Sequence, residues 1–429
     1  MLKAKRSRAA IAALAMVAVL GAACGDDNDE AAAPETAQNQ AAQAGQATTS
    51  AAKGVDTGAA TLRAGLTDLL SEHVYLAALA TGAALRGDNA GFESFANALN
   101  GPTRSNTSDL VAAIGSVYGP EVGKAFDGLW RSDKHIPQFV AYTQATAKGD
   151  KAGQDAAVTQ LKAYAKEFGA TLNSVNDKLP ADVVEGAIVE HATELIAVIN
   201  AQKAGDQKAV YQSLRGAYAH MAHTAQALAG GTVAKFPEKF DGTVDSKGAD
   251  LRAGLGLLMR EHVLLAGSAT GAALGGRMPQ FDAVAAALNG PTGSNTADIV
   301  AAVGSVYGPE VGKAFDGLWR SDKHIPQFVA YTQAAGQDDQ AGKDAAVAQL
   351  KAYAKEFGAT LNSVNDKLPA ATVEAAIVEH ATTLLAVIDA QAAKDPVAAA
   401  SALRSAVGHM SMSAQAIAAG TYAKFPEKF

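Results

Sequence analysis

The chain has a single cysteine, Cys24, among its 429 residues, so no disulfide can form within it. Basic residues are not clustered: the net charge is −7, and it becomes −11 without the four basic residues near the N-terminus. A scattered, acidic charge pattern excludes the basic surface that nucleic acids require. The chain also lacks a Gly-x-Ser-x-Gly, Walker or dinucleotide-binding motif. We therefore expect no nucleic-acid partner, and no motif indicates an enzyme.

The first 23 residues have the pattern of an export signal. Four basic residues within positions 3–8 precede an uncharged apolar run over 9–20, and the small residues Gly21, Ala22 and Ala23 follow. This order is typical of a secretory signal peptide, and the apolar run is too short to span a bilayer permanently. We predict that residues 1–23 are removed on export and that no later segment crosses a membrane.

Cys24 comes directly after the small residues, and this position resembles the lipobox of bacterial lipoproteins. Leu20 lies four places before the cysteine, where the lipobox usually has its leucine three places before it. The resemblance implies a lipid on Cys24 that anchors the protein to the outer face of the cytoplasmic membrane or within the periplasm or cell envelope. The alternative is ordinary cleavage, which leaves a free thiol on a secreted protein.

Most of the chain is a duplication. Residues 115–145 and 304–334 are identical, and their flanks match less closely at the same offset of 189. Before the first copy the sequence has almost no large apolar side chains, which predicts disorder. Each copy has a size that folds independently. The predicted organisation is a disordered tether over 24–60, a first domain over 61–240, a linker over 241–249 and a second domain over 250–429.

Each copy is predicted to be all-α. Apolar residues recur at spacings of three and four in segments that begin at Leu62, Val184 and Leu214, which gives one apolar face per helix. The segments over Phe95–Ile114 and Pro120–Tyr142 are also predicted to be helical. No segment rich in β-branched residues alternates with period two. The predicted fold is therefore two tandem up-and-down helical bundles.

Histidines recur at four matching positions, each on a different predicted helical segment. His73 and His191 lie within apolar faces, so their side chains should point into the bundle. Metal sites in helical bundles are built from inward side chains on facing helices. The predicted ligands are His73, His135, His191 and His220 in the first copy, and His262, His324, His380 and His409 in the second.

The last helix of each copy adds further candidate ligands. His220 and His223 are three positions apart and so lie on one side of a helix, and Met412 stands in place of His223 in the second copy. Because thioether ligands favour copper(I), this exchange indicates copper. Met221 and Met410 complete the candidate set.

Glutamates precede two histidines in each copy. Neighbouring helical residues differ by about 100° in direction, so a glutamate and the adjacent histidine cannot bind one central ion. We expect the glutamates to accept hydrogen bonds from imidazoles of other helices and so to fix their tautomers. The Glu-x-x-His spacing of di-iron bundles is absent. The glutamates concerned are Glu72, Glu190, Glu261 and Glu379.

These patterns favour an envelope protein that binds a transition metal, with copper preferred over zinc, iron or a non-covalent haem. No Cys-x-x-Cys-His motif is present for covalent haem attachment. The alternative is a non-enzymatic scaffold or interaction module of the envelope, with a protein partner and with histidines that are merely structural.

The repeats also share a longer pattern, which in the first copy consists of Leu62-Arg63, Glu72-His73-Val74, Gly115 to Gly119, Trp130, His135, Phe139-Val140, Tyr142, His191 and His220-Met221. This pattern resembles a helical domain of uncharacterised exported bacterial proteins, some of which are labelled copper amine oxidase-like because of a separate attached domain. The resemblance covers nearly all of each repeat and implies little about its chemistry. A copper amine oxidase builds its quinone from a tyrosine that follows an asparagine, and no Asn-Tyr pair exists here.

Overall fold

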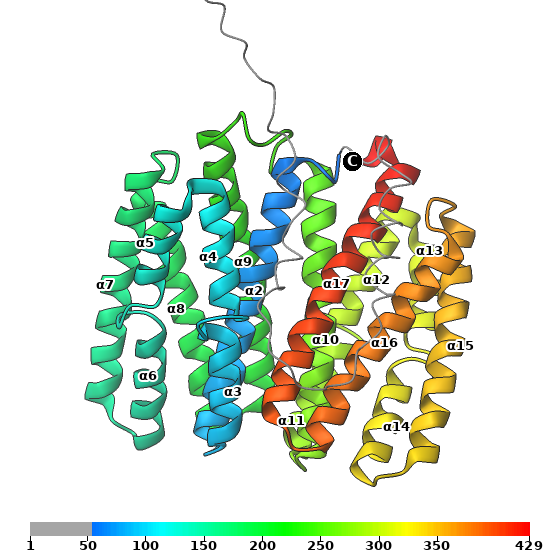
Figure 1. Ribbon diagram of the computed structural model, residues 1–429. Coiled ribbons are helices and arrows are strands. Elements are labelled where there is room, and N and C mark those ends of the chain that lie inside the picture. Colours follow the sequence, from blue (N-terminus) through cyan, green and yellow to red (C-terminus); the bar gives the residue numbers. More distant parts are fainter. Residues whose placement is uncertain (1–53) are drawn as a thin grey trace, which may run out of the picture. The chain divides into compact units, whose positions relative to one another are not determined.

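The computed structural model describes residues 54–429, and within this range the secondary structure is helical, without a strand (Figure 1). The predicted all-α class is confirmed. The predicted signal peptide, Cys24 and the part of the predicted tether up to residue 53 lie outside the described residues.

The two repeats contain the same helices in the same order. The first has α2 (Gly58–Leu85), α3 (Asn89–Asn100), α4 (Asn106–Tyr118), α5 (Pro120–Trp130), α6 (Ile136–Lys148), α7 (Lys151–Val175), α8 (Ala181–Ala204) and α9 (Gln207–Lys235). The second has α10 (Lys247–Leu274), α11 (Met278–Asn289), α12 (Asn295–Tyr307), α13 (Pro309–Trp319), α14 (Ile325–Gly336), α15 (Gln340–Val364), α16 (Ala370–Ala392) and α17 (Pro396–Lys424). A short 3₁₀ helix, Pro426–Lys428, follows α17.

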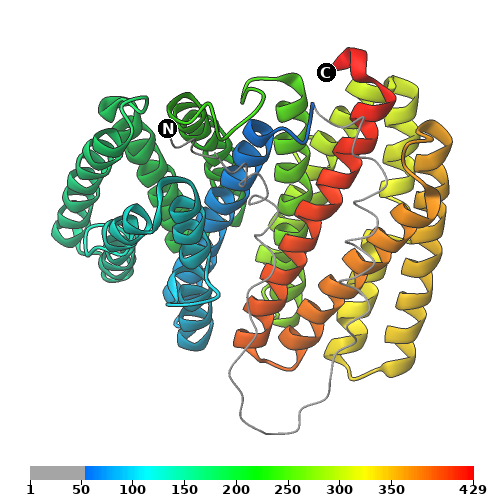
Figure 2. The same ribbon diagram turned by 45° about the horizontal axis from the view of Figure 1, so that its top comes forward.

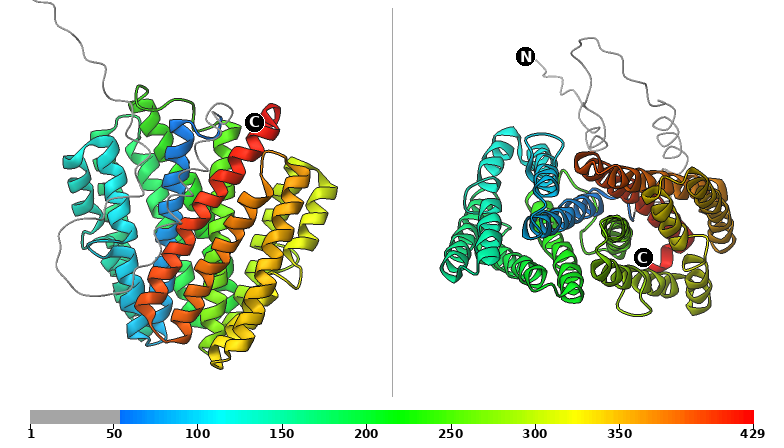
Figure 3. Two further views of the ribbon diagram at one scale, coloured as in Figure 1. Left: turned by 45° about the vertical axis from the view of Figure 1, so that its right-hand side comes forward. Right: turned by 90° about the horizontal axis from the view of Figure 1, so that it is seen from below.

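Each repeat is an up-and-down bundle in which the first helix is central. In the first repeat α2 contacts α3, α4, α6, α8 and α9. Two pairs of short helices each take the place of one long helix in the bundle. Figure 1 shows α4 above α3 and α5 above α6. Figure 3, in its view from below, shows the two bundles side by side with their helices roughly parallel.

Two predicted helices are each interrupted. The segment over Phe95–Ile114 divides into α3 and α4, because Ser105 caps α4 by accepting a hydrogen bond from the backbone N–H of Ser108. The segment over Pro120–Tyr142 divides into α5 and α6, with Pro137 in the first turn of α6, where proline is tolerated. The second break places His135 at the N-cap of α6.

The packed chain begins before residue 61, the predicted start of the first domain. Val55 is fully buried, and α2 begins at Gly58. The predicted linker is packed in the same way, since Val244 is 7% exposed. The backbone oxygens of these two valines accept hydrogen bonds from Arg252 and Arg63, each from the opposite repeat. The duplication therefore extends to Val55-Asp56, which matches Val244-Asp245 at the offset of 189.

The repeats pack against each other with pseudo-two-fold symmetry. Helix α2 packs on its own counterpart α10, and the contact of α3 with α17 is matched by that of α11 with α9. Figure 2 shows α2 and α10 near the middle of the molecule. Such an arrangement, in which one surface meets a copy of itself, is the isologous interface of a two-fold dimer, here made within one chain.

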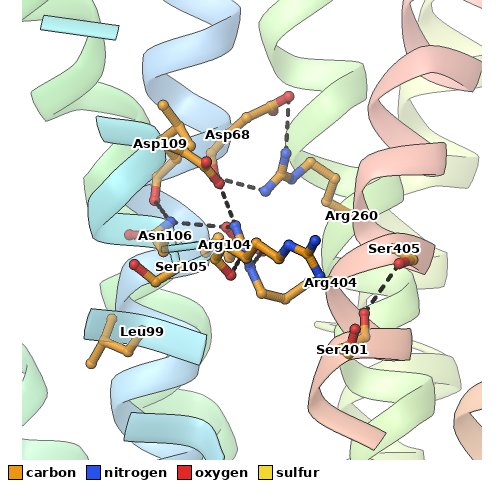
Figure 4. Close-up of polar contacts among 12 residues, drawn as sticks. Asp68, Leu99, Arg104, Ser105, Asn106, Asp109, Arg260, Ser401, Arg404 and Ser405 are labelled. Carbon is orange, nitrogen blue, oxygen red and sulfur yellow. Dashed lines mark hydrogen bonds and ion pairs between the residues drawn. The ribbon is translucent and has the colours of Figure 1, made fainter. Parts of the chain in front are cut away.

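Buried carboxylates dominate this interface. Arg404 of α17 donates to both oxygens of Glu72 at 3.1 and 3.2 Å. It also donates to Asp109 at 2.6 Å, and Figure 4 labels these two residues. Across the pseudo-axis, Arg215 of α9 makes the same contacts with Glu261 and Asp298. The side chains of both glutamates are 5% exposed, so each depends on an arginine from the other repeat to compensate its charge.

Helix α16 differs from the expectation that no later segment is apolar enough to span a membrane. By length and composition alone, it is long and apolar enough to cross a membrane. It packs against α15 and α17 in the second bundle, and helices at the core of a bundle meet the same criterion. This one helix is therefore weak support for a span.

We predict that Arg404→Ala lowers the free energy of unfolding by about 2–5 kcal/mol, because it leaves the Glu72 carboxylate buried without its charged partner. Urea denaturation measures the change. The control is Lys151→Ala, which removes the exposed Lys151–Asp155 pair and should change the free energy by less than about 0.5 kcal/mol. Equal effects of the two substitutions would contradict the role given to the buried pair.

Candidate metal centre

Three predicted histidine ligands of each repeat come together. His73 lies on α2, His135 at the N-cap of α6 and His191 on α8, and one ring nitrogen from each lies within 4.8 Å of the others. The second repeat brings His262, His324 and His380 together in the same way. These two groups are called the histidine triads below. Three helical elements of each bundle thus supply one ligand apiece, as predicted for an interior site.

The triads are buried among aromatic rings. The three histidines of the first repeat are 2–4% exposed, and their ring centroids are 5.6–6.4 Å apart. The ring of Tyr164 stacks on His135 at 4.5 Å, and Trp130 meets the edges of His73 and His135 at 5.0 and 4.8 Å. This enclosure holds the imidazole rings in place and keeps water away from them.

One hydrogen bond fixes the tautomer of the histidine that comes second in each triad, His135 or His324. His135 Nδ1 lies 3.0 Å from the carbonyl oxygen of Trp130, and His324 Nδ1 lies 2.9 Å from that of Trp319. A carbonyl oxygen only accepts, so Nδ1 carries the proton in each neutral ring. The lone pair of Nε2 is therefore free to bind a metal ion, and the backbone carbonyl orients the ring, as in many metal sites.

Several buried polar atoms around the triads have no hydrogen-bond partner. In the first repeat they include Nδ1 of His73 and of His191 and the hydroxyl of Tyr164. In the second they include both ring nitrogens of His380 and the hydroxyl of Tyr353. Buried polar groups in proteins are almost always paired. A cluster of unpaired nitrogens, repeated in both bundles, is expected where the nitrogens are the ligands of a metal ion.

Burial keeps the triads neutral at physiological pH. It lowers the pKa of His135 and of His324 to about 4, and that of His191 and of His262 to about 3. Burial also holds the pKa values of His73 and His380 well below the ordinary range, and the neighbouring histidines add to this effect. Metal binding at neutral pH would therefore release no proton from these six side chains.

A polar chain connects each triad to the opposite repeat. Asn106 donates from Nδ2 to Glu72 at 2.9 Å and to the Leu69 carbonyl at 2.8 Å. Its side chain lies beside His73 and opposes the lowering of the pKa of that histidine by burial, although Asn106 Oδ1 and His73 Nδ1 make no well-formed hydrogen bond. The order is thus Arg404, Glu72, Asn106 and His73, and Arg215, Glu261, Asn295 and His262 repeat it.

The fourth predicted histidine of each repeat lies outside its triad. His220 Nε2 contacts the Ala187 carbonyl at 3.3 Å, and His409 Nε2 contacts that of Ala376 at 3.0 Å. His220 instead forms a separate group with Glu190 and Glu194, in which Glu190 is exposed. The apolar face of α9 includes Met221, and the preceding residue points about 100° away from it, towards α8.

The remaining candidates are not brought to the triads. Met221 and Met410 are buried in the hydrophobic core, whereas His223 is exposed and Met412 is 57% exposed. Glu190 and Glu379 are exposed as well. Glu72 and Glu261 are buried, but arginine and asparagine side chains occupy their carboxylates. They reach the triads through an asparagine rather than by bonding to an imidazole directly.

The sequence analysis did not select Asn106 and Tyr164 or their counterparts. Ser105-Asn106-Thr107 recurs as Ser294-Asn295-Thr296 although the one residue on either side differs, which is a usable signal. An asparagine after a serine N-cap is common at helix starts, however, and nothing local indicates that its side chain is buried. Only the position of α4 beside α2 brings it to His73.

Each buried triad can hold a metal ion. An ion about 2.0–2.1 Å from three nitrogens requires nitrogens about 3.3–3.6 Å apart, and 4.8 Å is the upper limit of their separations here. The rings must therefore move by about 1 Å to bind one ion wherever a separation lies near this limit. The site offers three neutral imidazole ligands. The aromatic rings around it leave little access for water.

Comparisons with known proteins give no family: no family model, no curated protein and no solved structure matches the chain.

We predict that the metal-free protein loses stability as the pH falls from about 6.5 to about 4. The unfolded chain binds protons at its histidines in this window, whereas the buried histidines with folded pKa values of about 3 and 4 do not. The free energy of unfolding should fall by up to about 1.4 kcal/mol per pH unit for each buried histidine, and it should be flat above pH 7.

Urea denaturation at a series of pH values measures this slope. A variant with His191→Phe and His380→Phe should have a shallower slope, because two of the groups that the unfolded chain protonates are gone. A slope that is the same in the variant and the parent would contradict the assignment to the triads.

Proposed function

We propose that the protein binds copper in the cell envelope, one ion in each histidine triad, for storage or delivery. The observation that supports this most strongly is the pair of buried groups of neutral imidazoles, whose ring nitrogens converge and are largely unpartnered in both bundles. Histidines with a purely structural role would be expected to have their buried nitrogens paired.

Copper(I) suits the charge of the site. The candidate ligands of each triad are neutral, and the nearest buried carboxylates, Glu72 and Glu261, are already compensated by arginines. The cost of burying an ion without a counter-charge rises with the square of its charge, so a divalent ion costs about four times as much as a monovalent one. Imidazole is a suitable ligand for copper, and three nitrogens can complete the coordination of a monovalent ion.

The other metals and haem fit less well. Zinc and iron(II) carry two charges and prefer a fourth ligand or a carboxylate. A haem needs an open slot between two axial ligands, whereas Tyr164 and Trp130 pack directly on the imidazoles of the first triad. No Cys-x-x-Cys-His segment is present to attach a haem covalently.

The proposed location rests on the N-terminal sequence. The signal pattern and the position of Cys24 support export and a lipid anchor, which would place both bundles outside the cytoplasmic membrane. If the triads bind no metal, the protein is better explained as an envelope scaffold that contacts a protein partner.

Metal analysis of the mature protein, purified without an affinity tag or chelator, tests the proposal. We expect two copper(I) ions per chain in titrations against a chromogenic copper(I) chelator. Replacement of His73 and His191 by phenylalanine should reduce this to one, and additional replacement of His262 and His380 should reduce it to none. Zinc, titrated in parallel, should bind more weakly.

Two controls separate the triads from the other histidines. His220→Ala and His223→Ala change residues that lie outside the triads and should leave two ions bound. Micromolar or weaker binding of every metal, or loss of copper in the His223→Ala control, would show that the triads are not the copper sites.

A separate experiment tests the anchor. Cys24→Ser removes the only thiol, so the protein should move from the membrane fraction to the soluble fraction of the cell envelope, and mass spectrometry should show no added acyl chains. Alanine substitution of His223, which is far from the N-terminus in sequence, should leave the protein in the membrane fraction. Membrane association that persists in the Cys24→Ser protein would require another anchor.

A further inference from the structure

A cavity of about 580 Å³ lies between the two repeats. Its walls come from α2, α3 and the start of α4 on one side and from α17 on the other, and Arg260 of α10 also lines it (Figure 4). No histidine of either triad lines this cavity. Its volume is within the range of pockets that hold small molecules in proteins.

The pseudo-symmetry shows why the cavity is present on one side of the interface. At the offset of 189, Ala400 and Val407 in its wall correspond to Tyr211 and Tyr218. Those tyrosines are 4% and 2% exposed in the matching position, where Tyr211 accepts a hydrogen bond from Gln280 and Tyr218 donates one to the Leu257 carbonyl. Arg260 donates to the Asp68 carbonyl, which matches that of Leu257, so its guanidinium takes the place of the Tyr218 hydroxyl. Alanine in place of Tyr211 therefore opens the space.

A second difference between the two pseudo-symmetric halves of the interface is an exposed arginine, Arg104, in the wall of the cavity. Arg104 has a φ of 52°, a left-handed conformation that disfavours residues with a Cβ, and its counterpart is Gly293 with a φ of 60°. Such a conformation in a non-glycine residue costs free energy, and Asp338 and Lys394 adopt it at exposed turns as well. The side on which the tyrosines fill the space has glycine at this position and no guanidinium.

The charges in the cavity leave this arginine available. Arg260 is paired with Asp68 at 3.0 Å, and Arg404 is paired with Glu72 and Asp109. Within residues 54–429, the Arg104 side chain has neither a hydrogen-bond nor an ion-pair partner, while its carbonyl accepts from Arg404. One free guanidinium matches one carboxylate, which it can bind through two parallel hydrogen bonds.

The remaining lining limits the kind of anion. Leu69, Ala98 and Val397 give the cavity an apolar surface, which suits a short hydrocarbon chain. Asp109 and Glu72 also line the cavity but are paired with Arg404. The single charge of Arg104 would therefore leave one charge of a doubly charged group such as phosphate without a partner. The preferred ligand therefore carries one negative charge at one end and is apolar at the other.

We propose that this cavity binds a small organic monocarboxylate, with the carboxylate on Arg104 and the hydrocarbon part against α2 and α17. The site is independent of the copper proposal, because none of the triad residues takes part. Binding of such a molecule would also connect the two repeats, since its contacts come from both.

Calorimetric titration of the metal-free, full-length mature protein tests the proposal with acetate, butanoate, hexanoate and octanoate, and with inorganic phosphate. We expect saturable binding at one site per chain, with affinity rising about three- to fourfold per methylene group as apolar surface is buried. Phosphate should bind at least tenfold more weakly than hexanoate. Stronger binding of phosphate, or no saturable binding of any carboxylate, would overturn the proposal.

Two substitutions copy the closed side of the interface into the open one. Ala400→Tyr copies the Tyr211 side chain and should abolish hexanoate binding by filling the cavity. Arg104→Gly installs Gly293 and should weaken hexanoate binding at least tenfold, while the thermal unfolding temperature does not fall, because glycine adopts this φ without strain. Hexanoate binding that persists unchanged in both variants would place the carboxylate elsewhere and overturn the assignment.

Discussion

The buried glutamates of α2 and α10 are the constraint on which the arrangement of the two repeats depends. A carboxylate that is 5% exposed cannot remain charged without close partners, and Glu72 obtains them from Asn106 in its own repeat and Arg404 in the other. In each bundle the arginine that pairs with the buried glutamate comes from the other repeat. The two repeats therefore behave as one folded unit rather than as two domains on a linker, and the segments before α2 and α10 are buried in the same contact.

This constraint also reaches the triads. Asn106 is held by Glu72 and by the Leu69 carbonyl, so its one remaining polar atom faces His73. His135 is held in a different way, by a backbone carbonyl within its own repeat. The first histidine of each triad therefore depends on an arginine of the opposite bundle, whereas the second does not. A change at the interface should accordingly affect the position of one ligand while the ring of another stays in place.

The sequence was sufficient for features that depend on local pattern. Apolar periodicity predicted the helices, and the positions of His73 and His191 on apolar faces predicted that both point inward. The sequence was less reliable for the direction of a single side chain, because neighbouring residues on a helix point about 100° apart. His220 precedes the buried Met221 and points towards α8 instead of the triad. Sequence analysis also missed Arg404 as a partner of Glu72, since the two residues are 332 positions apart. A duplicated sequence does not reveal whether its copies pack on each other.

The two copies match at the histidine triads but differ at the interface between the repeats. The triads, their stacked tyrosines and the asparagines beside them are the same in both repeats, although the first and last helices have diverged. The interface has changed instead: Ser71 corresponds to Arg260, Tyr218 to Val407, and Arg104 to Gly293. A strictly symmetric interface would have two equal cavities or none. The two sides of the interface therefore differ in shape and charge, with a space and an unpaired arginine on one side alone, while each triad keeps the same three histidines and the same stacked tyrosine.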